Sequence, residues 1–179
     1  MNNTSLSKVW FAATRGASNW LWLSAFVVLL DQTTKALVVS AVKFKNSIEL
    51  LPFLRIVYLE NEGAAFSILH DAGGWQRWFF IGLALTVSVV LMLWLRRIRI
   101  PEQTVLAVGV ALVLGGALGN VIDRVWHSYV IDFIYVHWED WYFPAFNIAD
   151  SAISVGAVGL LIDAFQESGR EEKKLKGKA

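Results

Sequence analysis

Long apolar stretches separated by short charged segments dominate the hydropathy pattern of this chain. Residues 78–95 and residues 103–122 contain no Asp, Glu, Lys, Arg or His side chain, and they comprise 18 and 20 residues. A helix needs about 20 predominantly apolar residues to cross the hydrocarbon core of a bilayer, which is ~30 Å thick. Both stretches therefore predict transmembrane helices.

Two further apolar stretches are interrupted only by isolated charges. Residues 16–42 contain Asp31 and Lys35, and residues 141–162 contain Asp150. Both are long enough to cross a membrane. We therefore expect four transmembrane helices, at approximately residues 18–40, 77–95, 103–122 and 145–165.

The first apolar stretch has an alternative interpretation as a cleaved signal peptide. Lys8 and Arg15 precede it, as the basic residues of a signal peptide do. The apolar run continues to Val39, however, which is too long for a typical signal core, and residues 40–42 make a poor cleavage site. A retained transmembrane helix is the better interpretation.

The composition agrees with a membrane protein and excludes several classes of function. Only 17% of residues are charged and the mean hydropathy is +0.50, whereas a soluble domain carries about 25% charged residues. The net charge of +1 provides no basic face for the phosphates of a nucleic acid, so we expect no nucleic-acid partner. The absence of cysteine excludes disulfides, thiolate metal sites and cysteine nucleophiles.

The basic residues predict the orientation of the chain in the membrane. Ten of the sixteen Lys and Arg residues flank the spans on one side, namely Lys8, Arg15, Arg96, Arg97, Arg99, Arg170, Lys173, Lys174, Lys176 and Lys178. Short cytoplasmic flanks retain such positive charges. We therefore expect both termini and the tail 167–179 in the cytoplasm, and the loops 41–76 and 123–144 outside.

The two outer loops contain segments with the composition of β-strands. Leu50–Leu59 and Val130–Trp138 are rich in β-branched and aromatic residues, although their alternation is imperfect. We expect short strands packed on the membrane surface rather than a free-standing sheet. The predicted fold class is an integral membrane protein, mainly α, with four transmembrane helices and small extracytoplasmic β-rich segments in a single domain, residues 1–179.

Aromatic residues bracket the outer ends of three spans, as in an interfacial belt: Trp75, Trp78, Trp126, Trp138, Trp141 and Tyr142.

Polar residues at membrane depth are costly unless they are paired or functional. Asp31 and Lys35 are four residues apart, so on a helix they share a face and can form an ion pair. A structural role for this pair is the simplest interpretation, and positioning of a substrate or loop is the alternative.

The third span ends in a small-residue step followed by a polar cluster. Gly115 and Gly119 form a GxxxG step, which allows a neighbouring helix to approach closely. Asn120 shares a helical face with Asp123 and Arg124. An ion pair between Asp123 and Arg124 that closes the helix end is at least as good an interpretation as catalysis.

Two further acids lie in apolar surroundings at the predicted outer face. Asp132 lies within Val130–Ile134, and Asp150 begins the fourth span. Such an acid is often a helix cap or an ion-pair partner. Two acids within ~3 to 5 Å cannot both ionise, so one keeps a proton while the other acts as a base. That arrangement can activate water against an amide bond.

Five segments of the chain resemble the bacterial lipoprotein signal peptidases, the type II signal peptidases. They follow in the family's order, within a match that runs from about Asp31 to Gly156: DQTTK at 31–35, NEGAAFS at 61–67, GGALGNVIDR at 115–124, VIDF at 130–133 and FPAFNIADS at 143–151. The resemblance covers most of the chain, and five ordered segments make it highly specific.

The resemblance implies a four-span aspartic endopeptidase of the bacterial inner membrane. Such enzymes cut the signal peptide from prolipoproteins just before a diacylglyceryl-modified cysteine. The resemblance, rather than the residue pattern, selects Asp132 instead of Asp123 as the partner of Asp150 in the catalytic dyad. It also implies which residues hold the substrate backbone or the acids, namely Asn61, Asn120, Arg124 and Asn147.

The same resemblance implies the partners. We expect diacylglyceryl-modified prolipoproteins as substrates, contact with membrane lipids, inhibition by the cyclic peptide globomycin, no cofactor, and a monomer. We expect the active site near the periplasmic face, and the loop containing residues 61–66 to cover it and limit the entry of water.

Two other enzymatic interpretations are weaker. A Ser/Lys protease would use Lys35 as base with Ser67, Ser128 or Ser151 as nucleophile, but Asp31 keeps Lys35 charged. A metal enzyme would draw ligands from His127, His137 and nearby acids, but the spacing of these histidines matches no ligand motif, and His70 lies in a separate loop.

A small proton-coupled membrane carrier is the alternative from a different class. Carriers also place acids within membrane spans, usually near the midplane and often within internal repeats. Here the acids gather at one predicted face and the sequence shows no repeat.

Overall fold

Four long helices and a small antiparallel sheet form the protein. The computed structural model describes residues 17–63, 74–100 and 102–176, without the side chains of residues 170–176. A 3-10 turn, η1 (Ala17–Trp20), leads into the first helix. The long helices are α2 (Leu21–Ala41), α3 (Trp75–Leu95), α4 (Thr104–His127) and α5 (Ile148–Lys176). All four are long and apolar enough to span a membrane, which confirms the predicted fold class.

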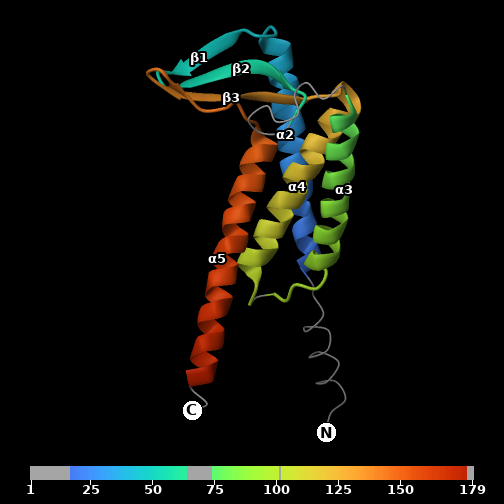
Figure 1. The fold of residues 1–179 in the computed structure, drawn as a ribbon, viewed down its shortest axis with the longest axis vertical. Helices are drawn as coiled ribbons and strands as arrows, with labels where there is room; N and C mark the ends of the chain where they lie inside the picture. The colour runs from blue at the N-terminus through green and yellow to red at the C-terminus, as the bar shows by residue number, and fades with distance from the viewer. Residues whose placement is uncertain (1–16, 64–73, 101, 177–179) are drawn as a thin grey trace.

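The sheet lies across one end of the helices (Figure 1). Its strands follow the order β1-β2-β3-β4 and all neighbours are antiparallel. They are β1 (Ser47–Leu51), β2 (Leu54–Asn61), β3 (Val130–Trp138) and β4 (Trp141–Tyr142). The end of α5 lies at the opposite end of the molecule (Figure 1), so the sheet and the last helical residues face opposite sides of the bundle.

The strand expected at Leu50–Leu59 contains a turn. Leu51 pairs with Leu54 across the two residues Pro52 and Phe53, because proline has no N–H group for a strand ladder and favours a turn. β3 has the expected bounds, Val130–Trp138.

Two helices are longer than the membrane spans expected within them. α4 continues past residue 122 to His127, because Asp123 and Arg124 find partners inside the protein and need not leave the helix to reach water. α5 continues past residue 165 to Lys176, so much of the segment expected as a solvated tail is helical. Its Glu and Lys residues favour helix, and polarity alone does not end one. Residues 177–179 lie outside the described residues.

Helix α4 lies at the centre of the bundle and is the most buried of the four. Of its most apolar window, 67% of residues are buried, against 22–28% for the other helices. Small residues allow this packing. A Cβ on Gly115 would lie 2.8 Å from the carbonyl oxygen of Ser24 in α2, and a Cβ on Gly109 would lie 2.9 Å from that of Gly156 in α5. The GxxxG step thus faces α2, and a second glycine contact faces α5.

Candidate active site

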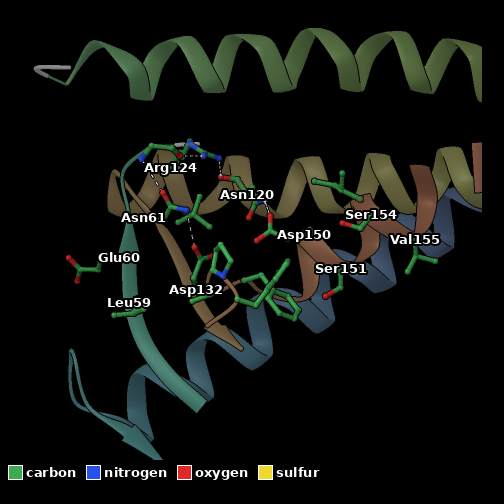
Figure 2. Close-up of a pocket in the computed structure, with 17 residues that line it drawn as sticks. Leu59, Glu60, Asn61, Asn120, Arg124, Asp132, Asp150, Ser151, Ser154 and Val155 are labelled. Atoms are coloured by element: carbon green, nitrogen blue, oxygen red, sulfur yellow. Dashed lines mark hydrogen bonds between the residues drawn. The ribbon is translucent and has the colours of Figure 1, made fainter. Parts of the chain in front are cut away.

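One cavity of about 960 Å³ opens between the sheet and the upper ends of α4 and α5. Figure 2 shows polar side chains from β2, β3, α4 and α5 converging on this cavity. The cavity lining includes five of the six expected site residues: Asn61, Asn120, Arg124, Asp132 and Asp150. The sixth, Asn147, lies fully buried behind them and contacts both acids.

Asp132 points from β3 into this cavity and is 4% exposed. Its two carboxyl oxygens accept hydrogen bonds from Asn61 Nδ2 at 2.9 Å and from Asn147 Nδ2 at 2.8 Å. The strand register explains the first contact. Asp132 pairs with Leu59 of β2, and Asn61 lies two residues further along the same face, within reach of a diagonal cross-strand contact.

Burial and, as the second cause, the nearby negative charge of Asp150 raise the pKa of Asp132 to about 7. The hydrogen bonds donated by Asn61 and Asn147 stabilise the charged form and oppose this rise. Asp132 is therefore a carboxyl that holds a proton close to neutral pH.

Asp150 occupies the first turn of α5, where it forms a capping box with Asn147. Asn147 Oδ1 accepts the Asp150 N–H at 2.9 Å, and Asp150 Oδ2 accepts the Asn147 N–H at 3.3 Å. Asn120 Nδ2 donates to the other oxygen, Asp150 Oδ1, at 2.8 Å. Backbone N–H groups at a helix N-terminus favour negative charge, so both donors and the helix end stabilise an anionic carboxylate here.

A single buried amide therefore links the two acids. Asn147 is 0% exposed, its Nδ2 donates to Asp132, and its Oδ1 accepts from the backbone of Asp150. This side chain fixes the two carboxyl groups relative to each other at the cavity wall.

Arg124 provides the positive charge of the cavity. Its guanidinium donates to the carbonyl of Gly63 at 3.0 Å and lies over the ring of Phe80, 5.1 Å from the centroid. The charges of Asp150 and Asp132 act on it electrostatically. Figure 2 places it beside Asn61 and Asn120, on the side of the cavity nearest α3.

Asp31 and Lys35 form the expected ion pair, with Asp31 Oδ2 and Lys35 Nζ 2.7 Å apart. The ion pair of Asp123 with Arg124 was one of two interpretations left open by the sequence. In the structure Asp123 instead contacts Lys35, at 2.7 Å. Consecutive residues on a helix point about 100° apart, so Asp123 faces α2 while Arg124 faces the cavity. Asp123 is not among the described residues that line the cavity.

The geometry gives little support to the serine and metal interpretations. Two carboxylates enclose the Lys35 ammonium, and the Ser151 hydroxyl donates to the carbonyl of Asn147 rather than facing a base. Within residues 17–63, 74–100 and 102–169, no three His, Asp or Glu side chains gather as a metal site. Ser67 and His70 of these two interpretations lie outside the described residues, as do residues 64–66 of the segment expected to cover the site.

Gln32 and Phe80 were not among the expected residues. Gln32 contacts an acid beside the site, and Phe80 contacts Arg124 of the site. Gln32 Nε2 donates to Asp123 Oδ1 at 2.8 Å, and Phe80 lies under Arg124. Gln32 could have been singled out as an amide within an apolar span next to Asp31. Phe80 gave no signal, since it is one aromatic residue among several in α3.

The amino-acid sequence is similar to those of a known protein family. The family model for signal peptidase (SPase) II matches residues 23–166. The lipoprotein signal peptidase of Acinetobacter baumannii is 52% identical over 147 residues, covering 82% of each chain. That of Pseudoalteromonas translucida is 49% identical over 155 residues, covering 86% of this chain and 93% of the relative.

A solved structure described as a bacterial membrane enzyme is also similar. It has a TM-score of 0.76 and 32% sequence identity, and the match covers 85% of this chain and 90% of that chain. A second structure with the same description has a TM-score of 0.70 and 33% identity. Since the family model and the relatives cover most of its length, this chain belongs to the signal peptidase II family.

Proposed function

We propose that this protein is an intramembrane aspartic endopeptidase that removes the signal peptide from bacterial prolipoproteins just before a diacylglyceryl-modified cysteine. The observation that carries the proposal is the pair Asp132 and Asp150, joined through Asn147 at the wall of one cavity. The family to which the chain belongs supports the same activity and gives no support to a proton-coupled carrier.

The different surroundings of the two acids divide the chemistry between them. Asp150 lies at a helix N-terminus and accepts two hydrogen bonds, so it serves as the base that takes a proton from water. The water oxygen then bonds to the scissile carbonyl carbon. Asp132, which holds a proton near neutral pH, donates it to the carbonyl oxygen.

Collapse of the resulting tetrahedral diol completes the reaction. The carbon–nitrogen bond breaks as the proton on Asp150 passes to the leaving nitrogen, and a hydroxyl proton of the diol returns to Asp132. The two acids thereby regain their starting protonation states, and hydrolysis consumes one water molecule. No metal or cofactor is required for these proton transfers.

Polar donors around the dyad suit an extended peptide backbone. We assign substrate binding to Asn61, Asn120 and Arg124, which line the cavity. The buried Asn147 holds the two acids. Arg124 lines the same cavity as both acids, so its guanidinium can donate to a substrate carbonyl. The apolar side of the cavity, which includes Phe143, Ile153 and Val155, suits the hydrocarbon of a lipidated substrate.

We place the enzyme in the bacterial inner membrane as a monomer surrounded by lipid, with both termini in the cytoplasm. The distribution of basic residues supports this orientation. The residues that line the cavity come from the end of the bundle that carries the sheet. The last residues of α5 lie at the opposite end (Figure 1). With the termini in the cytoplasm, the sheet and the cavity face the periplasm. A diacylated substrate would reach it from the outer leaflet.

Cleavage of a diacylated prolipoprotein, compared with its unlipidated form, tests the function. We expect the purified protein to cleave the diacylated form and to be blocked by globomycin, which would occupy the dyad. Equal cleavage of both forms would contradict the assigned substrate. Proton flux into liposomes without any peptide hydrolysis would support the carrier instead.

A further inference from the structure

Three ionisable side chains that the proposed chemistry does not use lie buried beside the two acids. Asp31 and Lys35 from α2 and Asp123 from α4 are 0%, 2% and 1% exposed. Lys35 Nζ lies 2.7 Å from a carboxyl oxygen of Asp31 and 2.7 Å from one of Asp123. We call these three residues the buried cluster. Charges at membrane depth are costly and usually serve a purpose.

Each acid of the buried cluster holds the backbone next to one catalytic acid. Asp31 Oδ1 accepts the N–H of Ala149 at 2.9 Å, and Ala149 directly precedes Asp150. Asp123 Oδ2 accepts the N–H of Ile131 at 3.2 Å, and Ile131 directly precedes Asp132. The same lysine bridges both acceptors, so one ion cluster joins the two chain segments that carry the dyad.

The third contact of Lys35 reaches the dyad through a side chain. Lys35 Nζ donates to Asn120 Oδ1 at 3.3 Å, and Asn120 Nδ2 donates to Asp150 Oδ1 at 2.8 Å. An ammonium group has only donors, so it holds the amide oxygen toward itself and the amide nitrogen toward Asp150. With the amide reversed, an oxygen would face the Asp150 carboxylate and an N–H₂ group would face the ammonium.

Neighbouring residues fit the buried cluster closely. Gln32 Nε2 donates to Asp123 Oδ1 at 2.8 Å and contacts Asp31 Oδ2 at 3.2 Å. A Cβ on Gly119 would lie 2.8 Å from Asp31 Oδ2, so only glycine leaves space for this carboxylate. The cluster is thus held in one arrangement by hydrogen bonds and by packing.

We infer that Asp31, Lys35 and Asp123 are positioning residues that fix the backbone beside both catalytic acids and, through Asn120, present a hydrogen-bond donor to Asp150. The inference rests on the proposed assignment of Asp132 and Asp150 as the dyad. The buried cluster does not appear among the described residues that line the cavity, so it acts on the acids rather than on the substrate.

A double-mutant cycle between Lys35 and Asn120 tests this inference. Steady-state cleavage of diacylated prolipoprotein is measured for the wild type, Lys35→Met, Asn120→Ala and the double variant. A cooperative thermal unfolding transition shows that each variant is folded. We expect Lys35→Met to lower kcat by about 10-fold to 100-fold, as small misplacements of catalytic groups do, with KM within about 3-fold of the wild-type value. We expect the loss in kcat of the double variant to be smaller than the product of the two single losses, because Lys35 acts on Asp150 partly through Asn120.

Lys43→Met is the matched control, since Lys43 is exposed, and it should cleave at the wild-type rate. If Lys35→Met does not fold, the variant Lys35→Gln with Asp123→Asn keeps the net charge of the cluster and replaces it in the comparison. Unchanged kcat in the folded variant would overturn the inference, as would losses that multiply in the double variant. Asp150→Asn is assayed alongside: if it cleaves normally, the dyad assignment fails, which is a separate result.

Discussion

The surroundings of Asp132 determine how one carboxyl of the pair holds a proton. Burial and the charge of Asp150 raise its pKa to about 7, while the Asn61 and Asn147 donors act in the opposite direction. Loss of this proton above the pKa would leave two anions at the cavity and no acid for the carbonyl oxygen. Activity should therefore decline as the pH rises through about 7.

Replacement of Asn61 by alanine should move this decline to higher pH. Asn61 stabilises the charged form of Asp132, so its removal raises the pKa further and extends the pH range in which Asp132 is protonated. The pH profile of kcat/KM, which reports ionisations of the free enzyme, measures the shift. Asn46→Ala, at an exposed asparagine before β1, should leave the profile unchanged. A shift of the Asn61→Ala decline to lower pH would contradict this assignment.

At the scale of elements, the close contact between α4 and α5 positions Asp150. A Cβ on Gly116 would meet the carbonyl of Ala149 and the side chain of Ile153, both at the start of α5. The acid lies one residue beyond that carbonyl. The spacing of these two helices is therefore tied to the geometry of the site.

Gly116→Ala should reduce both stability and cleavage. The added methyl group must displace backbone, and such overpacking costs about 1–3 kcal/mol. Gly82→Ala on α3 is the matched control, because a Cβ there meets nothing within 4 Å, and alanine is a better helix former. Thermal unfolding in detergent should show a lower Tm for Gly116→Ala alone. Equal Tm values for both variants would mean that α5 moves freely to accept the methyl group.

The sequence predicted the elements whose signals are local. Apolar length marks each membrane span whatever its neighbours are, and the β-branched run at Val130–Trp138 marks β3. The partner of Asp123 was not predictable in this way, because it is Lys35 from another helix, 88 positions away in sequence.

The candidate site also combines features that were predictable from the sequence with features that were not. The residue pattern identified Asp132 and Asp150 as acids in apolar surroundings, but offered no distance with which to prefer Asp132 over Asp123. The resemblance supplied that preference, and the cavity lies against Asp132. The pairing of Asp123 was missed because adjacent opposite charges in sequence look like partners, although a helix points them apart.

At the scale of the whole molecule, the sheet lies at one end of the bundle and the last residues of α5 lie at the other (Figure 1). The cavity is lined by residues of β2 and β3 and so lies at the end that carries the sheet. A multi-pass membrane protein with this arrangement presents its chemistry to one side of the membrane. The orientation proposed from the basic residues puts that side in the periplasm.

Single-cysteine labelling should confirm which side this is, since the chain has no native cysteine. Ser47→Cys in β1 and Ser168→Cys near the end of α5 both replace exposed serines. In intact spheroplasts, a membrane-impermeant maleimide should label Ser47→Cys at once and Ser168→Cys only after permeabilisation. The reverse pattern would place the cavity in the cytoplasm.

The rate of prolipoprotein cleavage by purified Asp132→Asn and Asp150→Asn variants tests the dyad most directly. Asp140→Asn, at an exposed acid in the β3–β4 turn, is the matched control, and thermal unfolding confirms that each variant is folded. We expect both dyad variants to lose about 100-fold or more in rate, the scale of general acid–base catalysis, while Asp140→Asn cleaves like the wild type. Near-normal cleavage by a folded Asp132→Asn or Asp150→Asn protein would remove that residue from the dyad and contradict the proposed mechanism.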